Sequence, residues 1–249
     1  MRKISIFVSV FVVINLLIGF NVLAQENTIT DEDITAEDLG ISEPKVLPDN
    51  FFYFFKNLWR GVRLTFTFDP VKKAELQLRH ANERLIEAKK MAEKIGKEEF
   101  VGKAVEKYQK EMGKLQTRVE KFEEKATDNP KIESFLSRFT NTAIKQQVLI
   151  EKLEGNLEHN PKALEKIRTA KEQVLENHSR VIQQLEEKTQ IKERLEENIQ
   201  QMKQENMPAD LEQKLEQAKE NIKQRIEAIQ EEQEQEGTTT QNKGKGQEE

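Results

Sequence analysis

The sequence has no cysteine and little glycine or proline, with ten glycines and six prolines in 249 residues. The absence of cysteine excludes disulfides, thiol catalysis, cysteine-ligated zinc sites and a lipoprotein anchor cysteine. It leaves the compartment open, because an exported protein need not contain cysteine. Glu, Lys, Gln, Leu and Ala dominate instead, a mixture typical of long helices and coiled coils.

Apolar residues are also scarce, at 36%, and the mean hydropathy is -0.77. With 34% charged residues, the composition argues against a large compact core. The net charge of -5 is too small, and of the wrong sign, for a basic protein that binds nucleic acid. The charge is unevenly spread: residues 25–50 carry eight acids and one lysine, whereas residues 51–110 carry fourteen Lys/Arg against eight Asp/Glu.

The N-terminus has the three parts of a secretory signal peptide. Arg2 and Lys3 precede an apolar run over residues 4–23, and the small residues of Val22-Leu23-Ala24 predict cleavage before Gln25. A retained membrane anchor formed by residues 4–23 is the alternative, because about 20 apolar residues can span a bilayer. A buried core helix fits poorly, since nothing polar alternates with the apolar positions. Both main interpretations predict export to the periplasm or the extracellular side of the cell envelope.

Apolar residues then recur in steps of three and four, which predicts packed helices. Proline, glycine and asparagine separate these helices, so consecutive helices should be antiparallel. Asp69-Pro70 predicts a capped helix start, and Gly96 predicts an end. The fold class expected is an all-α, elongated antiparallel helical bundle with coiled-coil hairpins. Its expected helices cover residues 70–95, 101–126, 132–157, 162–205 and 211–229.

Changes in composition suggest the domain limits. Residues 25–46 are acidic and poor in apolar side chains, which predicts a flexible linker. Residues 47–160 are expected to form a bundle domain with an aromatic first helix. Residues 161–235 are expected to add a long helix and an antiparallel coiled-coil hairpin. The polar, low-complexity stretch 236–249 predicts a disordered tail.

No residue pattern indicates catalysis, a metal or a cofactor. None of His80, His159 and His178 follows a glutamate by three residues, the spacing expected of metal ligands in bundles. His80 falls off the apolar row and is expected at the surface, whereas His178 occupies a core position that can set helix register. The carboxylate pairs lie among Lys and Gln on helix faces, and no phosphate-binding loop or nucleophile motif is present. The prediction is a protein that is not an enzyme.

The aromatic stretch at residues 51–68 has two possible roles. Eight of the thirteen aromatics after Ala24 fall within residues 51–68. On a helix they form an apolar face beside a basic one. The favoured interpretation is that the apolar face docks on the bundle, against the alanine row at residues 74, 81, 88 and 92. The alternative is contact with a membrane interface or a partner, through Phe51, Phe52, Phe55, Trp59, Lys56, Arg60 and Arg63.

The same region carries a resemblance. Pro48, the aromatic segment, Leu64-Thr65-Phe66-Thr67-Phe68-Asp69-Pro70 and Ala81-x-x-Arg84-Leu85-x-Glu87-Ala88 together resemble a bacterial domain of unknown function, number 5667. The likeness is strongest over residues 47–90, and the Thr-Phe-Asp-Pro hinge is its most specific part. It implies an exported or membrane-tethered helical protein and no particular activity. Only three residues, Met1 to Lys3, precede the apolar segment, so no cytoplasmic domain is expected.

Three functions are compatible with these features. The first is a scaffold in the cell envelope that presents charged faces to a protein partner and can form oligomers through its coiled coil. The second is a periplasmic chaperone or stress sensor that cradles unfolded clients. The third is a peripheral membrane protein that uses residues 51–68. Burial of that segment would favour the scaffold, a concave exposed patch the chaperone, and a convex exposed patch the membrane protein.

Overall fold

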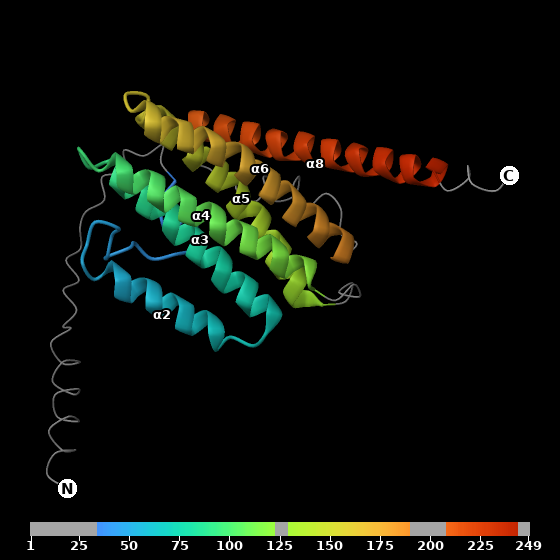
Figure 1. The fold of residues 1–249 in the computed structure, drawn as a ribbon, viewed down its shortest axis with the longest axis horizontal. Coiled ribbons are helices and arrows are strands. Elements are labelled where there is room, and N and C mark those ends of the chain that lie inside the picture. The colour runs from blue at the N-terminus through green and yellow to red at the C-terminus, as the bar shows by residue number, and fades with distance from the viewer. Residues whose placement is uncertain (1–33, 123–128, 190–207, 244–249) are drawn as a thin grey trace, which may run out of the picture. The chain divides into compact units, whose positions relative to one another are not determined.

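The computed structural model describes residues 34–122, 129–189 and 208–243, which contain six helices and no strand (Figure 1). The all-α prediction is confirmed. The apolar segment 4–23 lies outside the described residues, so the signal peptide and its anchor alternative stay predictions. Among the described helices, none is long and apolar enough to cross a bilayer. The elements are α2 (Tyr53–Thr65), α3 (Pro70–Ala92), α4 (Glu98–Glu120), α5 (Pro130–Asn156), α6 (Pro161–Thr189) and α8 (Ala209–Lys243).

Three of the helices begin with the same capping pattern. Asp69, Asn129 and Asn160 each precede a proline, and each side chain accepts a backbone N–H of the first helical turn. Asp69, for example, accepts from Val71 at 2.9 Å. The cap satisfies an amide that has no partner within the helix, while proline supplies the helical φ without needing a partner for itself. Short polar turns can therefore reverse the chain without leaving the helix ends unsatisfied.

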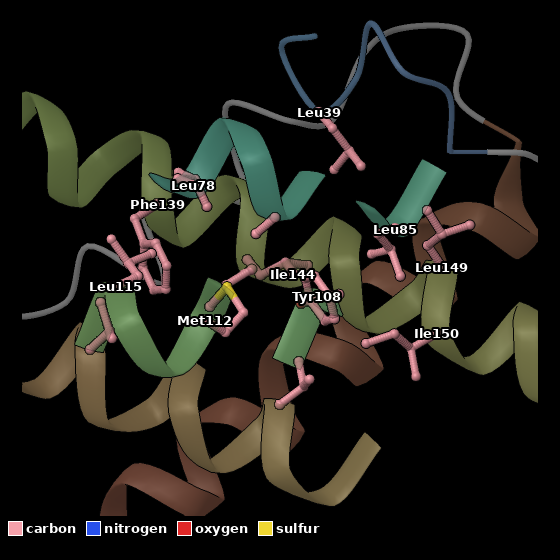
Figure 2. Close-up of a cluster of buried hydrophobic side chains, with 14 of the residues drawn as sticks. Leu39, Leu78, Leu85, Tyr108, Met112, Leu115, Phe139, Ile144, Leu149 and Ile150 are labelled. Atoms are coloured by element: carbon pink, nitrogen blue, oxygen red, sulfur yellow. The ribbon is translucent and has the colours of Figure 1, made fainter. Parts of the chain in front are cut away.

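Helices α3, α4, α6 and α5 form a four-helix bundle in that order around the core, and α2 contacts α3. Because α3 and α5 are separated by one antiparallel helix, they run parallel. Ion pairs link corresponding turns of the two helices, from Asp69 to Lys131 at 3.1 Å and from Glu75 to Arg138. Large side chains from all four helices meet in the core, and Figure 2 labels several of those from α3, α4 and α5.

The described residues on both sides of residue 160, where a domain boundary was expected, lie in one compact unit. Helix α6 is the fourth member of the bundle, and α8 packs against both α5 and α6. Leu215, Ala218 and Ile222 of α8 belong to the same buried cluster as the residues of α3 and α4. The apolar row on α6 therefore serves the main core rather than a separate hairpin. The expected part of this long helix from residue 190 to 205 lies outside the described residues.

The structure corrects the predicted linker over residues 25–46 from Ile34 onward. Ile34, Ala36, Leu39 and Ile41 are buried in the core, each at most 6% exposed. The backbone carbonyl of Leu39 accepts the side-chain amide of Asn82 at 2.7 Å. Figure 2 shows Leu39 on a loop directed at the helices. The average composition of this stretch hid a few apolar residues whose spacing suits a gap between two helices.

The predicted disordered tail is also partly wrong, because α8 continues to Lys243. Starting a helix is costly, but each added residue extends it at little cost. Residues 236–243 follow a formed helix with no proline between them, so they continue it despite their polar composition. Residues 244–249 lie outside the described residues.

Candidate functional site

Helix α2 carries its apolar residues on the side that faces solvent. Phe54, Phe55, Leu58 and Trp59 are 56 to 70% exposed, and Val62 is 38% exposed. Their spacing of three and four residues places them on one side of the helix. Four phenylalanines that flank the helix are exposed too. We call the whole set the aromatic face: Phe51, Phe52, Phe54, Phe55, Leu58, Trp59, Val62, Phe66 and Phe68.

The opposite side of α2 is polar and faces the bundle. Tyr53 and Arg60 are buried, while Lys56, Asn57 and Leu64 are half-buried. Docking of the aromatic face on the alanine row was therefore the wrong expectation. The helix does dock on α3, but it docks through its polar side.

An ion cluster explains why the polar side faces inward. Glu87 of α3 has a side chain with no solvent exposure. One of its carboxylate oxygens accepts from Lys56 Nζ at 2.8 Å and from Arg60 Nη2 at 2.9 Å. Arg60 also pairs with Glu83, one turn earlier on α3. Two carboxylates of α3 thus hold two cations of α2.

Arg84 completes this cluster. Its Nη1 lies 3.1 Å from the second carboxylate oxygen of Glu87, and its Nη2 donates to Asn57 Oδ1 at 2.6 Å. The hydroxyl of Tyr53 donates to Glu87 and accepts from Arg84. We call these seven residues the ion cluster: Tyr53, Lys56, Asn57, Arg60, Glu83, Arg84 and Glu87.

The cluster fixes the charge states of its members. Burial alone would raise the pKa of Glu87, but Arg60, Arg84 and Lys56 outweigh it and hold that pKa below its ordinary value. Burial and the charge of Glu87 raise the pKa of the Tyr53 phenol. Glu87 is therefore a carboxylate and Tyr53 a neutral hydrogen-bond donor at neutral pH. Both are structural groups that hold α2 in one orientation.

The seven residues predicted for membrane or partner contact divide between the two sides of α2. Phe51, Phe52, Phe55 and Trp59 are exposed, as that interpretation requires. Arg63 is exposed as well. Lys56 and Arg60 instead point toward α3. Helical spacing placed them beside the aromatic face, but only the position of Glu83 and Glu87 shows which way they turn.

One feature of the sequence indicates that α2 and α3 form ion pairs. Arg84 and Glu87 are the two charged positions that the motif Ala81-x-x-Arg84-Leu85-x-Glu87-Ala88 specifies. Their spacing of three places them on one side of α3, where a row of otherwise apolar residues would need no charge. A buried arginine and glutamate one turn apart require partners from another element, and α2 supplies them.

Two of the three histidines, His80 and His178, are buried, whereas His159 is exposed. His178, fully enclosed, lies 2.7 Å from Gln146 Oε1 through Nε2 and 3.1 Å from Gln147 Nε2 through Nδ1. Burial lowers its pKa to about 3. His80 is 6% exposed, which corrects the surface position expected for it, and burial followed by the charge of Arg60 lowers its pKa to about 4. Within the described ranges no three His, Asp or Glu side chains are grouped to hold a metal.

The chain can be assigned to a family because its sequence matches a family model. The model of a domain of unknown function, number 5667, matches residues 45–207. The chain belongs to this family. The family 5667 region includes the aromatic face, the ion cluster and the whole four-helix bundle, and it ends just before α8. No curated protein and no solved structure significantly matches the chain.

Proposed function

We propose that this protein is a peripheral membrane protein of the cell envelope that binds the bilayer surface through its aromatic face. The observation that carries the proposal is the outward orientation of nine large apolar side chains on and beside α2. Soluble monomers rarely expose an apolar patch of more than a few hundred Å², and larger patches mark contacts with proteins or membranes. The buried ion cluster holds the patch outward.

The geometry of α2 suits an interfacial helix. Such helices lie in the plane of the membrane with one apolar face in the boundary between headgroups and acyl chains. Trp59 stands on that face, and tryptophan prefers the depth of the headgroups because its ring is apolar and its N–H is polar. Helix α2 lies at the periphery of the described bundle (Figure 1), which suits contact with a flat surface.

The local charge favours a membrane over a second copy of the protein. From Asn50 to Phe68 the chain contains three cations and no carboxylate. Lys56 and Arg60 are neutralised by Glu83 and Glu87 of α3, which leaves Arg63 as the exposed cation of the segment. An anionic lipid surface attracts this cation, whereas two copies joined through the same face would bring two Arg63 side chains together. Charge complementarity therefore supports the lipid surface.

The expected location of the protein fits this proposal. A signal peptide or an anchor at residues 4–23 would bring the protein to the envelope. If the anchor is retained, the ten steps from Ala24 to Ile34 span at most about 35 Å. The bundle would then stay near the bilayer, so even weak interfacial binding would be enhanced by tethering. Scaffold and client-binding functions gain less support, because the apolar segment is exposed and the outer side of a single helix is convex.

The only tryptophan of the chain, Trp59, reports directly on this contact. Its indole is 70% exposed, so its fluorescence should start at a long wavelength and shift to the blue when phospholipid vesicles are added. Phe55→Glu combined with Leu58→Glu should abolish both the shift and co-sedimentation with vesicles. Ile95→Glu is the matched control, because Ile95 is fully exposed outside the aromatic face. Emission of the wild type that does not change with any vesicle would refute the proposal.

A further inference from the structure

A groove of about 660 Å³ lies beside the aromatic face. It follows the seam between the parallel helices α3 and α5. Its lining includes Leu39 and Gly40 of the N-terminal loop, Arg63 in the last turn of α2 and Thr67 of the α2–α3 connection. Its volume lies within the range of about 300 to 1,000 Å³ that is usual for small-molecule sites.

The position of the loop explains why the groove exists. Residues 34–41 cover part of the seam between α3 and α5, where Leu39 is buried and Asn82 bonds its carbonyl. Beside the loop, the buried side chains of Leu78 and Phe135 form the apolar part of the groove lining. The groove is thus the section of the seam that the N-terminal loop does not fill.

The carboxylates of the groove are largely neutralised by its own cations. Glu75 pairs with Arg138, and Asp38 lies 3.9 Å from Lys145. Asp38 also accepts the backbone amide of Thr35 at 2.9 Å. Two of the three carboxylates that line the groove therefore have cationic partners inside it, and Glu37 at the loop end is the third.

Three further cations have no such partner. Arg63 of α2 and Lys72 and Arg79 of α3 line the groove, are exposed, and make no ion pair within the described part of the chain. Lys72 and Arg79 are seven residues apart, so they lie on the same side of α3. Arginine presents a fork that matches phosphate oxygens, and lysine adds a compact charge. The groove carries five cations against three carboxylates and is suited to a phosphate group.

The groove and the aromatic face share an edge. Thr67 lines the groove, while its neighbours Phe66 and Phe68 are 71% and 85% exposed and belong to the aromatic face. Arg63 lines the groove from the last turn of α2. A ligand with a phosphate group and an apolar chain could therefore occupy the cationic groove and the aromatic face at once.

We propose that the groove binds the headgroup phosphate of an anionic phospholipid, with Arg63, Lys72 and Arg79 as its cationic ligands. This inference rests on the proposed membrane binding and specifies the lipid class. The aromatic face supplies binding to any fluid bilayer. The groove supplies the preference for anionic phospholipid, because the choline cation of phosphatidylcholine offsets the charge of that lipid's phosphate and is repelled by Arg63, Lys72 and Arg79. A free soluble phosphate has the same polar chemistry but lacks the acyl chains that would contact Phe66 and Phe68.

The test uses the full-length protein and the fluorescence of Trp59 to measure binding to vesicles. One set contains phosphatidylcholine alone, a second adds phosphatidylglycerol, and a third adds oleate at the same surface charge. Lys72→Ala combined with Arg79→Ala removes two groove cations. Lys110→Ala combined with Lys162→Ala is the matched control, because both lysines are exposed and lie outside the groove.

The groove variant should bind phosphatidylglycerol vesicles roughly 10- to 30-fold more weakly than the wild type. Each cation near an anionic surface contributes about 1 kcal/mol to binding, and the variant lacks two. Its binding to phosphatidylcholine should not change, and the control pair should behave as the wild type in all three sets. The wild type should prefer phosphatidylglycerol to oleate.

Three results would overturn the inference. Equal losses in the groove and control variants would show that only net charge matters, and equal binding of oleate and phosphatidylglycerol would exclude headgroup recognition. Glycerol 3-phosphate that binds as tightly as phosphatidylglycerol vesicles would assign the groove to a soluble ligand. None of these three results contradicts membrane binding through the aromatic face, because binding to phosphatidylcholine vesicles tests that proposal separately. Failure of the wild type to bind any vesicle would reject the membrane proposal itself, and this inference with it.

Discussion

Trp59 and Arg60 are adjacent in the chain and lie on opposite sides of α2. Trp59 is 70% exposed, whereas Arg60 is 8% exposed and held by Glu83 and Glu87. The usual arrangement of an amphipathic helix, with apolar residues inside and charges outside, is reversed here. The reversal is possible because α3 offers two carboxylates as partners for the cations of α2. It leaves the aromatic residues free for an external surface.

The first prediction concerns Trp59→Ala. Because the indole is mostly exposed, its loss should change the free energy of unfolding by no more than about 0.5 kcal/mol. Leu85→Ala, at a fully buried position of α3, should cost about 2 to 5 kcal/mol in the same thermal melts. A similar loss in both variants would mean that the aromatic face packs against the protein.

The second prediction concerns the ion cluster. Glu87→Ala leaves Lys56, Arg60 and Arg84 without their shared carboxylate, and breaking a buried pair in this way costs about 3 to 5 kcal/mol. The loss should appear first as faster amide hydrogen exchange in α2, because the four-helix core does not depend on that helix. Glu99→Ala is the control.

The control removes an exposed partner of Lys103 on α4, which should change stability by less than about 1 kcal/mol. If the α2 amides of the Glu87→Ala protein keep their wild-type protection, the cluster does not hold the helix.

The third prediction concerns pH. The pKa of His178 is lowered to about 3 and that of His80 to about 4 in the folded protein. Below the ordinary histidine pKa of about 6.5, the unfolded chain binds protons that the folded chain does not, so stability should fall as the pH falls. Each buried histidine should contribute up to about 1.4 kcal/mol per pH unit. Urea unfolding between pH 5 and 6.5 measures this slope above the range in which carboxylates titrate.

Variants assign the slope to its residues. His178→Gln and His80→Gln should each remove one histidine's share of the pH dependence, whatever they do to stability at pH 7. His159→Gln should keep the full slope, because His159 is exposed on the turn before α6. A wild-type stability that is flat from pH 6.5 to 5 would mean that both buried histidines protonate freely.

The fourth prediction compares two glycines. Gly96, in the turn after α3, has a φ of 73°, where a side chain costs about 1 to 2 kcal/mol. Gly113 lies within α4, and an added Cβ would meet no atom within 4 Å. Gly113→Ala should therefore stabilise the protein by about 0.5 to 1 kcal/mol, while Gly96→Ala destabilises it. Thermal melts that shift in the same direction for both would contradict this reading of the turn.

Local chemistry made the helices predictable. The caps at Asp69, Asn129 and Asn160 and the turn at Gly96 are short-range features, and the three-four spacing of apolar residues reports which side of each helix is buried. Even so, these patterns describe one helix at a time. They do not state that α6 completes the bundle, or that Ile34 and Leu39 fill the seam between α3 and α5, because those outcomes depend on the shape of the assembled core.

The sequence by itself determined the all-α class, most helix limits, the family resemblance and the presence of an amphipathic α2. Only the tertiary structure decided which side of α2 faces inward. A helix with an apolar face and a basic face can dock through either one, and the choice depends on what the neighbouring helix offers. Glu83 and Glu87 favour the basic face, because a carboxylate buried without cations would cost more than leaving aromatic rings in water.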